Sequence, residues 1–186
     1  MFYVLDTERD IFANNIHYAP KTSWVSIKCP INRGHQRAGG REGPLRVILD
    51  ENITDFMWTF IGEVVITDRV AKLFKEAGFT GYELEPVEVV NRQDITVWKF
   101  NVTGKGGKAQ GLYLKYRCEA CGLERYGGYE NGIIFDEKEW DGSDFFEVDG
   151  WGVILITERV KDFIEKHGLT NVIIIPLNEF KVDPDI

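Results

Sequence analysis

The chain has 186 residues, enough for one domain or two small units that share a core, and its apolar content of 44% is ample for a packed interior. The formal net charge of -8 argues against nucleic acid and anionic membranes as partners, because both attract basic proteins. No stretch approaches the roughly 20 apolar residues of a membrane span. No secretory signal or disulfide framework is visible among the three cysteines and the N-terminal residues, so we expect a cytoplasmic protein with reduced thiols or a metal.

The first informative segment is WVSIKCPIN, residues 24–32, in which a strand-like run leads into a turn at Cys29. A turn of this kind, a knuckle, folds two thiolates that are separated by two residues onto one zinc ion. The second position of the pair holds Asn32, and a neutral amide oxygen is a poor zinc ligand. His35 follows three residues later, so we expect His35 to replace the missing cysteine.

Residues 64–87, VVITDRVAKLFKEAGFTGYELEPV, predict a strand, a helix and a second strand. Thr67 is a typical N-cap, because its hydroxyl can accept a hydrogen bond from an unpaired amide of the first helical turn. Gly78 fits the left-handed position at which many helices end. Between them, apolar residues recur at helical spacing and predict one buried face: Val70, Leu73, Phe74 and Ala77.

A second knuckle lies in YLKYRCEAC, residues 113–121, and a glycine follows its second cysteine. This segment aligns with residues 24–32 at an offset of 89, so that the first cysteines of both knuckles coincide. Two knuckles that face each other predict one structural zinc site with three cysteines and one histidine. The predicted ligands are Cys29, His35, Cys118 and Cys121.

Two alternatives to this zinc site remain open. Zinc could have been lost, so that the knuckles merely pack as turns. A redox role for the cysteine pair is the other alternative, but thioredoxin-type pairs open a helix, whereas CEACGLERYGGYE reads as a turn between strands.

The acidic loop DEKEWDGSDFFEVDGW, residues 136–151, allows two interpretations. A solvated loop over buried aromatic side chains is the usual meaning of such a run, and we expect Phe145 to be buried. Aromatic residues exposed beside carboxylates would instead recognise a basic protein. The candidate partner-binding residues are Trp140, Asp141, Asp144 and Trp151.

Residues 154–177, ILITERVKDFIEKHGLTNVIIIPL, repeat residues 64–87 without a gap at an offset of 90. The repeat predicts an α+β fold built by tandem duplication of a strand–knuckle–hairpin–helix–strand unit, with a zinc-ribbon-like pair of knuckles. The two units are residues 1–92 and 93–186, packed as one compact globule. The apolar run VIIIP has no alternation, so we expect its strand to be covered on both faces.

Three of these motifs, CEACG, WDGSDFF and residues 154–177, resemble the bacterial double-CxxCG motif paralogous family. The resemblance is strongest over the last third of the chain, and it departs at the first knuckle, which lacks the second cysteine. Better-understood members of this family are immunity proteins for polymorphic toxins. The resemblance implies a cytoplasmic protein that binds and neutralises a cognate toxin without catalysis.

The resemblance and the acidic composition together predict a stoichiometric complex with a toxin, which a basic surface on the toxin would favour. No catalytic motif such as G-x-S-x-G or H-E-x-x-H is present. Two other classes stay open: an enzyme or small-ligand binder with a pocket between the repeats, and a zinc-ribbon module that binds nucleic acid, which the net charge disfavours.

Overall fold

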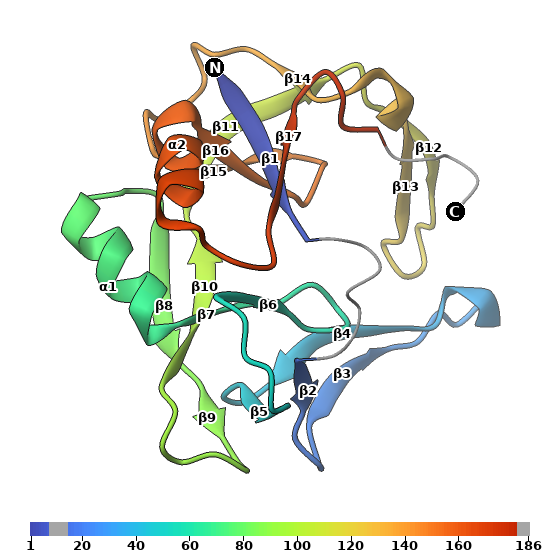
Figure 1. Ribbon diagram of the computed structural model, residues 1–186. Helices are drawn as coiled ribbons and strands as arrows, with labels where there is room; N and C mark the ends of the chain where they lie inside the picture. Colours follow the sequence, from blue (N-terminus) through green and yellow to red (C-terminus); the bar gives the residue numbers. More distant parts are fainter. Residues whose placement is uncertain (8–14, 182–186) are drawn as a thin grey trace.

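The structure is a computed structural model that describes residues 1–7 and 15–181 (Figure 1). It confirms a mixed α+β protein, in which two helices accompany several small sheets. The helices are α1 (Asp68–Ala77) and α2 (Glu158–His167), with 3-10 helices over Arg33–His35 and Tyr129–Asn131. Neither α1 nor α2, nor any other helix of the described part, is long and apolar enough to cross a membrane.

The strands divide between the two halves of the chain. Those of the first half are β1 (Phe2–Asp6), β2 (Ile16–Tyr18), β3 (Ser23–Ile27), β4 (Arg37–Glu42), β5 (Arg46–Leu49), β6 (Phe56–Trp58), β7 (Val64–Thr67), β8 (Tyr82–Pro86) and β9 (Glu88–Val89). Those of the second half are β10 (Val97–Val102), β11 (Gly104–Gln110), β12 (Tyr113–Arg117), β13 (Glu124–Gly127), β14 (Ile134–Phe135), β15 (Phe145–Asp149), β16 (Ile154–Thr157) and β17 (Ile173–Pro176).

Both helices begin and end where the sequence predicts. The Thr67 hydroxyl accepts a hydrogen bond from the Val70 amide at 3.4 Å, and Thr157 is the N-cap of α2 without this bond. Gly78 and Gly168 adopt left-handed conformations with φ of 65° and 56°, which glycine adopts without steric cost.

The two halves exchange a strand, which the sequence does not indicate. β10 of the second half lies between β7 and β8, and β1 of the first half lies between β16 and β17. The registers correspond: Trp98 pairs with Ile66 and Pro86, whereas Tyr3 pairs with the aligned residues of the other half, Ile156 and Pro176. The division at residue 92 stays a prediction, because each half completes a sheet of the other.

Aromatic side chains from both halves form the main core beneath the helices. The Phe145 ring lies 5.2 Å from that of Phe74 and 4.9 Å from that of Phe100, and Phe79 lies 5.0 Å from Phe163. Phe145 is fully buried, as predicted. Because rings from each half fill the space between both helices, neither half encloses this core alone.

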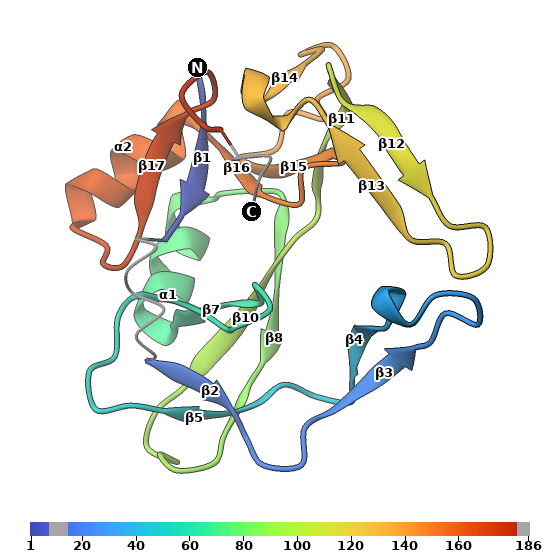
Figure 2. The ribbon, with the colours of Figure 1, turned by 90° about the vertical axis from the view of Figure 1, so that its right-hand side faces the viewer.

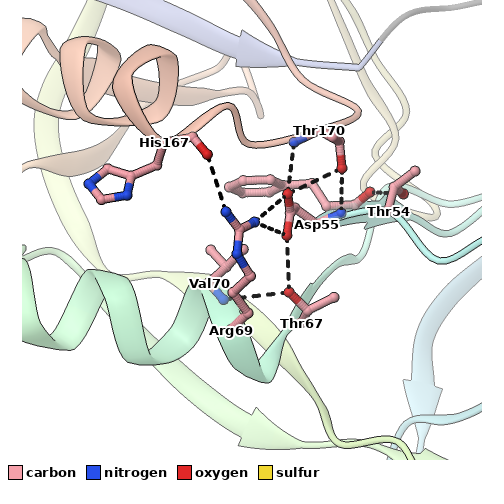
Figure 3. Close-up of polar contacts among 8 residues, drawn as sticks. Thr54, Asp55, Thr67, Arg69, Val70, His167 and Thr170 are labelled. Carbon is pink, nitrogen blue, oxygen red and sulfur yellow. Dashed lines mark hydrogen bonds and ion pairs between the residues drawn. The ribbon is translucent and has the colours of Figure 1, made fainter.

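A buried carboxylate ties α1 to the segment that follows α2 (Figure 3). Asp55 forms an ion pair of 2.7 Å with Arg69 and accepts hydrogen bonds from the amide and hydroxyl of Thr170 at 3.0 and 3.2 Å. The Arg69 guanidinium also donates to the carbonyl of His167, the last residue of α2. This clamp therefore satisfies a helix C-terminus that would otherwise lack a partner.

The other half contains a matching clamp. Asp144 forms an ion pair of 2.9 Å with Arg159 and accepts from the amide and hydroxyl of Thr80 at 3.0 and 3.3 Å. Arg159 donates to the carbonyl of Ala77, the last residue of α1. Each half thus supplies the carboxylate that fixes the loop after the helix of the other half.

Two hairpins extend from this body as arms (Figure 2). The first arm, residues 23–42, contains β3 and β4, and the second arm, residues 113–127, contains β12 and β13. Each arm is a separate two-stranded sheet, and their loops meet at the tips, far from both helices. The tips carry the two predicted knuckles.

Candidate metal centre

The four predicted metal ligands come together where the tips of the arms meet. The ligand atoms of Cys29, His35, Cys118 and Cys121 all lie within 4.8 Å of one another. The Sγ atoms of Cys29 and Cys118 are 3.8 Å apart, and Nδ1 of His35 is 3.8 Å from Sγ of Cys121. Three of the four residues are buried, and Cys121 is half-buried. Such a cluster of donors could hold a metal ion.

The second knuckle is closed by its own backbone. The Cys118 amide donates to the Leu123 carbonyl, and the Gly122 amide donates to the Cys118 carbonyl, both at 2.8 Å. Gly122 has a φ of 66°, which explains the glycine directly after the cysteine pair. This turn directs both sulfur atoms to the same side.

The first knuckle reaches the same point with a different residue. Asn32, which aligns with Cys121, caps the 3-10 helix by accepting a hydrogen bond from the Gly34 amide at 2.8 Å. This short helix turns the buried His35 toward the sulfur atoms. The side-chain amide of Asn32 lies 3.0 Å from Nε2 of His35 and fixes the orientation of the ring.

The surroundings favour the thiolate form in the second knuckle. Burial raises the pKa of Cys121, but hydrogen bonds from the Leu123 amide and the Arg37 guanidinium outweigh it and lower this pKa to about 7. Burial likewise opposes the lowered pKa of Cys118, which results from hydrogen bonds of His35 and of backbone amides. The pKa of Cys29 is raised, mainly by burial. Thiolates are the form in which cysteine binds metals.

Arg37 links the two arms directly, although no sequence motif marks it as part of the metal centre. From β4 of the first arm, its guanidinium lies 3.7 Å from Sγ of Cys121 and donates to the Cys121 carbonyl at 3.2 Å. Three thiolates and a divalent ion leave one negative charge, which this guanidinium offsets. The pattern CPINRGHQR contains several basic residues, and no spacing rule distinguishes Arg37 among them.

Two of the four predicted partner-binding residues, Asp144 and Trp151, are buried. Trp151 lacks the exposure that the partner-binding interpretation of the loop requires: only 8% of this residue is exposed, because its ring packs on Tyr129 and Phe180. Trp140 is half-buried, with its ring 5.0 Å from that of Phe2. Asp144 is buried in the clamp with Arg159.

Asp141 is the exposed member of the predicted partner-binding set. It accepts a hydrogen bond from the Ser143 amide at 3.0 Å and one from the Lys105 amide at 2.8 Å. These bonds shape its own loop and attach that loop to β11. The role of the four residues in partner binding stays a prediction, and the burial of Asp144 and Trp151 leaves them little surface to offer.

A pocket lies between the halves, at the place that the alternative of an enzyme or small-ligand binder requires. A cavity of about 420 Å³ is lined by first-half residues such as Trp58 and Glu63, by Lys99 of β10, and by Glu147 and Ile154 of the second half. Lys99 lies 3.3 Å from Glu63, which also lines the cavity, so this lysine is paired within the lining. The cavity lies on the body and does not include the metal centre.

Fold and site together define a mixed α+β protein in which two arms meet at a cluster of three cysteines and one histidine. In comparisons with known proteins, no protein-family model matches the chain, and no curated protein is significantly similar to it.

Proposed function

We propose that this chain is an immunity protein, which binds a cognate bacterial toxin in the cytoplasm and neutralises it by stoichiometric association. One observation carries the proposal: four protein ligands converge on the candidate metal site, so a tetrahedral ion there has no open position for a substrate. A closed site stabilises structure, whereas a catalytic site keeps one position free. The resemblance of CEACG, WDGSDFF and residues 154–177 to the double-CxxCG family adds the biological role.

The metal in this proposal is zinc. Zinc–sulfur distances of about 2.3 Å and zinc–nitrogen distances of about 2.0 Å place tetrahedral ligand atoms about 3.5–3.8 Å apart. Two of the six separations among these ligand atoms are 3.8 Å, close to this range, and all six lie within 4.8 Å. Zinc would join the first arm to the second, and the residues that hold it are Cys29, His35, Cys118 and Cys121.

We also propose that the chain arose by tandem duplication of one unit, and that the knuckles form a zinc-ribbon-like pair. Three observations support this duplication. Ile66 and Ile156, which are aligned in the sequence, occupy corresponding registers in their sheets, each opposite a strand from the other half. The two clamps have corresponding partners, and Cys29 lies beside Cys118. Exchange of β1 and β10 then makes the two copies interdependent.

Rescue of growth tests the proposed immunity. A candidate toxin, taken from a reading frame adjacent to the gene for this chain, is expressed in a susceptible bacterium with and without this chain. We expect growth only with the chain, and a 1:1 complex in size-exclusion chromatography. When the purified toxin is titrated with this chain, toxin activity should be lost fully at a molar ratio of one chain per toxin. An enzyme that inactivated the toxin would abolish its activity at a far lower ratio of chain to toxin. Absence of both rescue and complex would refute the proposal.

A second candidate, a small-ligand binder, is favoured by the cavity of about 420 Å³ between the halves, a volume that is ordinary for ligand sites. Native mass spectrometry of the protein from its own cells would show a bound molecule, which Val153→Trp should displace by filling the cavity. A native mass equal to the mass of the chain plus its metal, with no additional molecule, would exclude this candidate.

A further inference from the structure

The arms differ in charge from the rest of the chain. Of the 22 Lys and Arg residues, seven lie in residues 23–42 and 113–127, whereas only three of the 30 Asp and Glu residues do. The arms therefore carry a formal charge of +4 and the remainder of the chain carries −12. A partner that contacts the arms is favoured when its contacting surface is acidic.

The second arm also presents apolar side chains to solvent. All five residues of β12 are exposed, including Tyr113, Leu114 and Tyr116 with exposed fractions of 55, 47 and 42%. Tyr126 of β13 is exposed as well. An isolated two-stranded hairpin is marginally stable in water, so a partner that covers this arm would stabilise it. Tyrosine and arginine, together with tryptophan, are enriched among the residues that dominate binding at protein interfaces.

A pocket between the arm tips combines these features. It has a volume of about 430 Å³ and is lined by Asn32, Gly34 and His35 of the first arm and by Tyr116 and Arg125 of the second. The Tyr116 ring contacts the His35 ring at 5.6 Å. Within residues 1–7 and 15–181, the Arg125 guanidinium forms no ion pair with a carboxylate. A guanidinium forms bidentate hydrogen bonds with a carboxylate or a phosphate, and on an unmodified protein partner that group is a carboxylate.

We propose that the arms form the toxin-binding surface, with an aspartate or glutamate side chain of the toxin in the pocket beside Arg125. Leu114, Tyr116 and Tyr126 form the apolar contacts around this anchor. The inference rests on the proposed immunity function and assigns its interface. The inference also predicts that the surface of the toxin in contact with the arms is acidic, whatever the overall charge of the toxin.

Basic and aromatic residues together are also typical of surfaces that bind single-stranded nucleic acid. A protein partner is favoured here because the arms also expose the aliphatic side chains of Val25, Ile31 and Leu114. Aliphatic side chains gain free energy when a protein surface buries them, but they provide no flat ring for a base to stack on.

The position of the pocket makes toxin binding dependent on the metal. Its walls come from both arms, and the metal ligands hold the two tips together. Removal of the metal should therefore weaken toxin binding, although the metal itself need not contact the toxin. By linkage, the bound toxin should tighten metal binding by the same factor.

The test measures the dissociation constant between the metal-loaded full chain and the candidate toxin from the adjacent reading frame. We expect Arg125→Glu and Leu114→Asp each to weaken binding by about tenfold or more. Lys166→Glu on α2, which reverses charge far from the arms, should stay within twofold. Metal analysis and circular dichroism verify that each variant keeps its metal and its fold, and chelated wild-type protein is compared in the same assay.

The outcomes separate the two proposals. If the wild-type chain binds the toxin and both arm variants bind it equally well, the arms are not the interface and the immunity function stands. If the wild-type chain does not bind, both proposals fail. Binding of a single-stranded RNA oligonucleotide that Arg125→Glu abolishes, with toxin binding unchanged, would reassign the arms to nucleic acid and overturn the inference.

Discussion

Glu63 is the carboxylate through which the first arm is attached to the body. Arg41 of β4 donates to both of its oxygens, at 3.1 and 3.2 Å. Lys99 of β10 lies 3.3 Å away, and the Tyr18 hydroxyl donates at 3.0 Å. The side chains of Arg41 and Glu63 are only 7% and 14% exposed, so water screens this ion pair weakly.

We predict that Glu63→Gln lowers the free energy of unfolding by about 1–3 kcal/mol at pH 7, because two cations lose their counter-charge. Burial raises the pKa of Glu63, but hydrogen bonds from Arg41 and Tyr18 outweigh it and leave the pKa lowered. A lowered folded-state pKa means that the stabilisation is complete above the unfolded-state pKa of about 4.3 and is lost as pH falls through the folded-state pKa.

Urea unfolding between pH 3 and pH 8 measures this effect. The difference between wild type and Glu63→Gln should be constant at neutral pH and should shrink in acid. Glu88→Gln is the matched control, because its pair with Arg46 is exposed, and its change should stay within about 0.5 kcal/mol. Equal effects of the two substitutions would contradict this account of the arm.

At the same scale, the sequence predicts the metal ligands better than their surroundings. The spacing in CPINRGH is sufficient to predict His35 as the fourth ligand, and the structure brings it to the three sulfur atoms. Arg37 and Glu63 are not predicted, because their roles depend on partners from distant strands. Trp151 is misjudged, because an aromatic residue in an acidic loop can turn inward as easily as outward.

Individual elements follow from local signals, but their pairing does not. Helical spacing, threonine N-caps and left-handed glycines define α1 and α2 within the sequence. The exchange of β1 and β10 cannot be predicted in this way, because strand partners are chosen by packing between distant segments. The run VIIIP is expected to be covered on both faces, but β17 is the edge strand of its sheet and is only half-buried.

The two clamps predict matched mutational effects. Asp55→Ala and Asp144→Ala each leave the amide of a distant threonine, Thr170 or Thr80, without its acceptor. We expect each substitution to lower the free energy of unfolding by about 1–3 kcal/mol, and the two losses to agree within about 1 kcal/mol.

Urea unfolding at pH 7 measures both losses, and Asp162→Ala is the control. Asp162 is exposed on α2, so its removal should change stability by about 0.5 kcal/mol or less. If one clamp variant had the same free energy of unfolding as the control while the other lost several kcal/mol, the two clamps would not stabilise the fold equally, and this prediction would be wrong.

In the whole molecule, the arms and the body are held together by different interactions. The body has an aromatic core shared by both halves, whereas the arms have no core of their own and meet at the cysteine–histidine cluster. We predict that chelation removes hydrogen-exchange protection from residues 23–42 and 113–127 and leaves α1, α2 and the strands beside them protected. Mass spectrometry of exchanged peptides checks this prediction. Uniform loss of protection would mean that the cluster stabilises the entire fold.

The measurement that tests the central claim most directly is the amount of zinc per chain in protein purified without added metal. We predict one zinc ion per chain, a strong decrease in Cys118→Ser on the second arm, and no decrease in the control variant Ser26→Ala on the first arm. Acid should release the zinc, because protonated thiols do not bind it. A native chain without zinc, which takes none up when zinc is added, would contradict a metal-joined pair of arms.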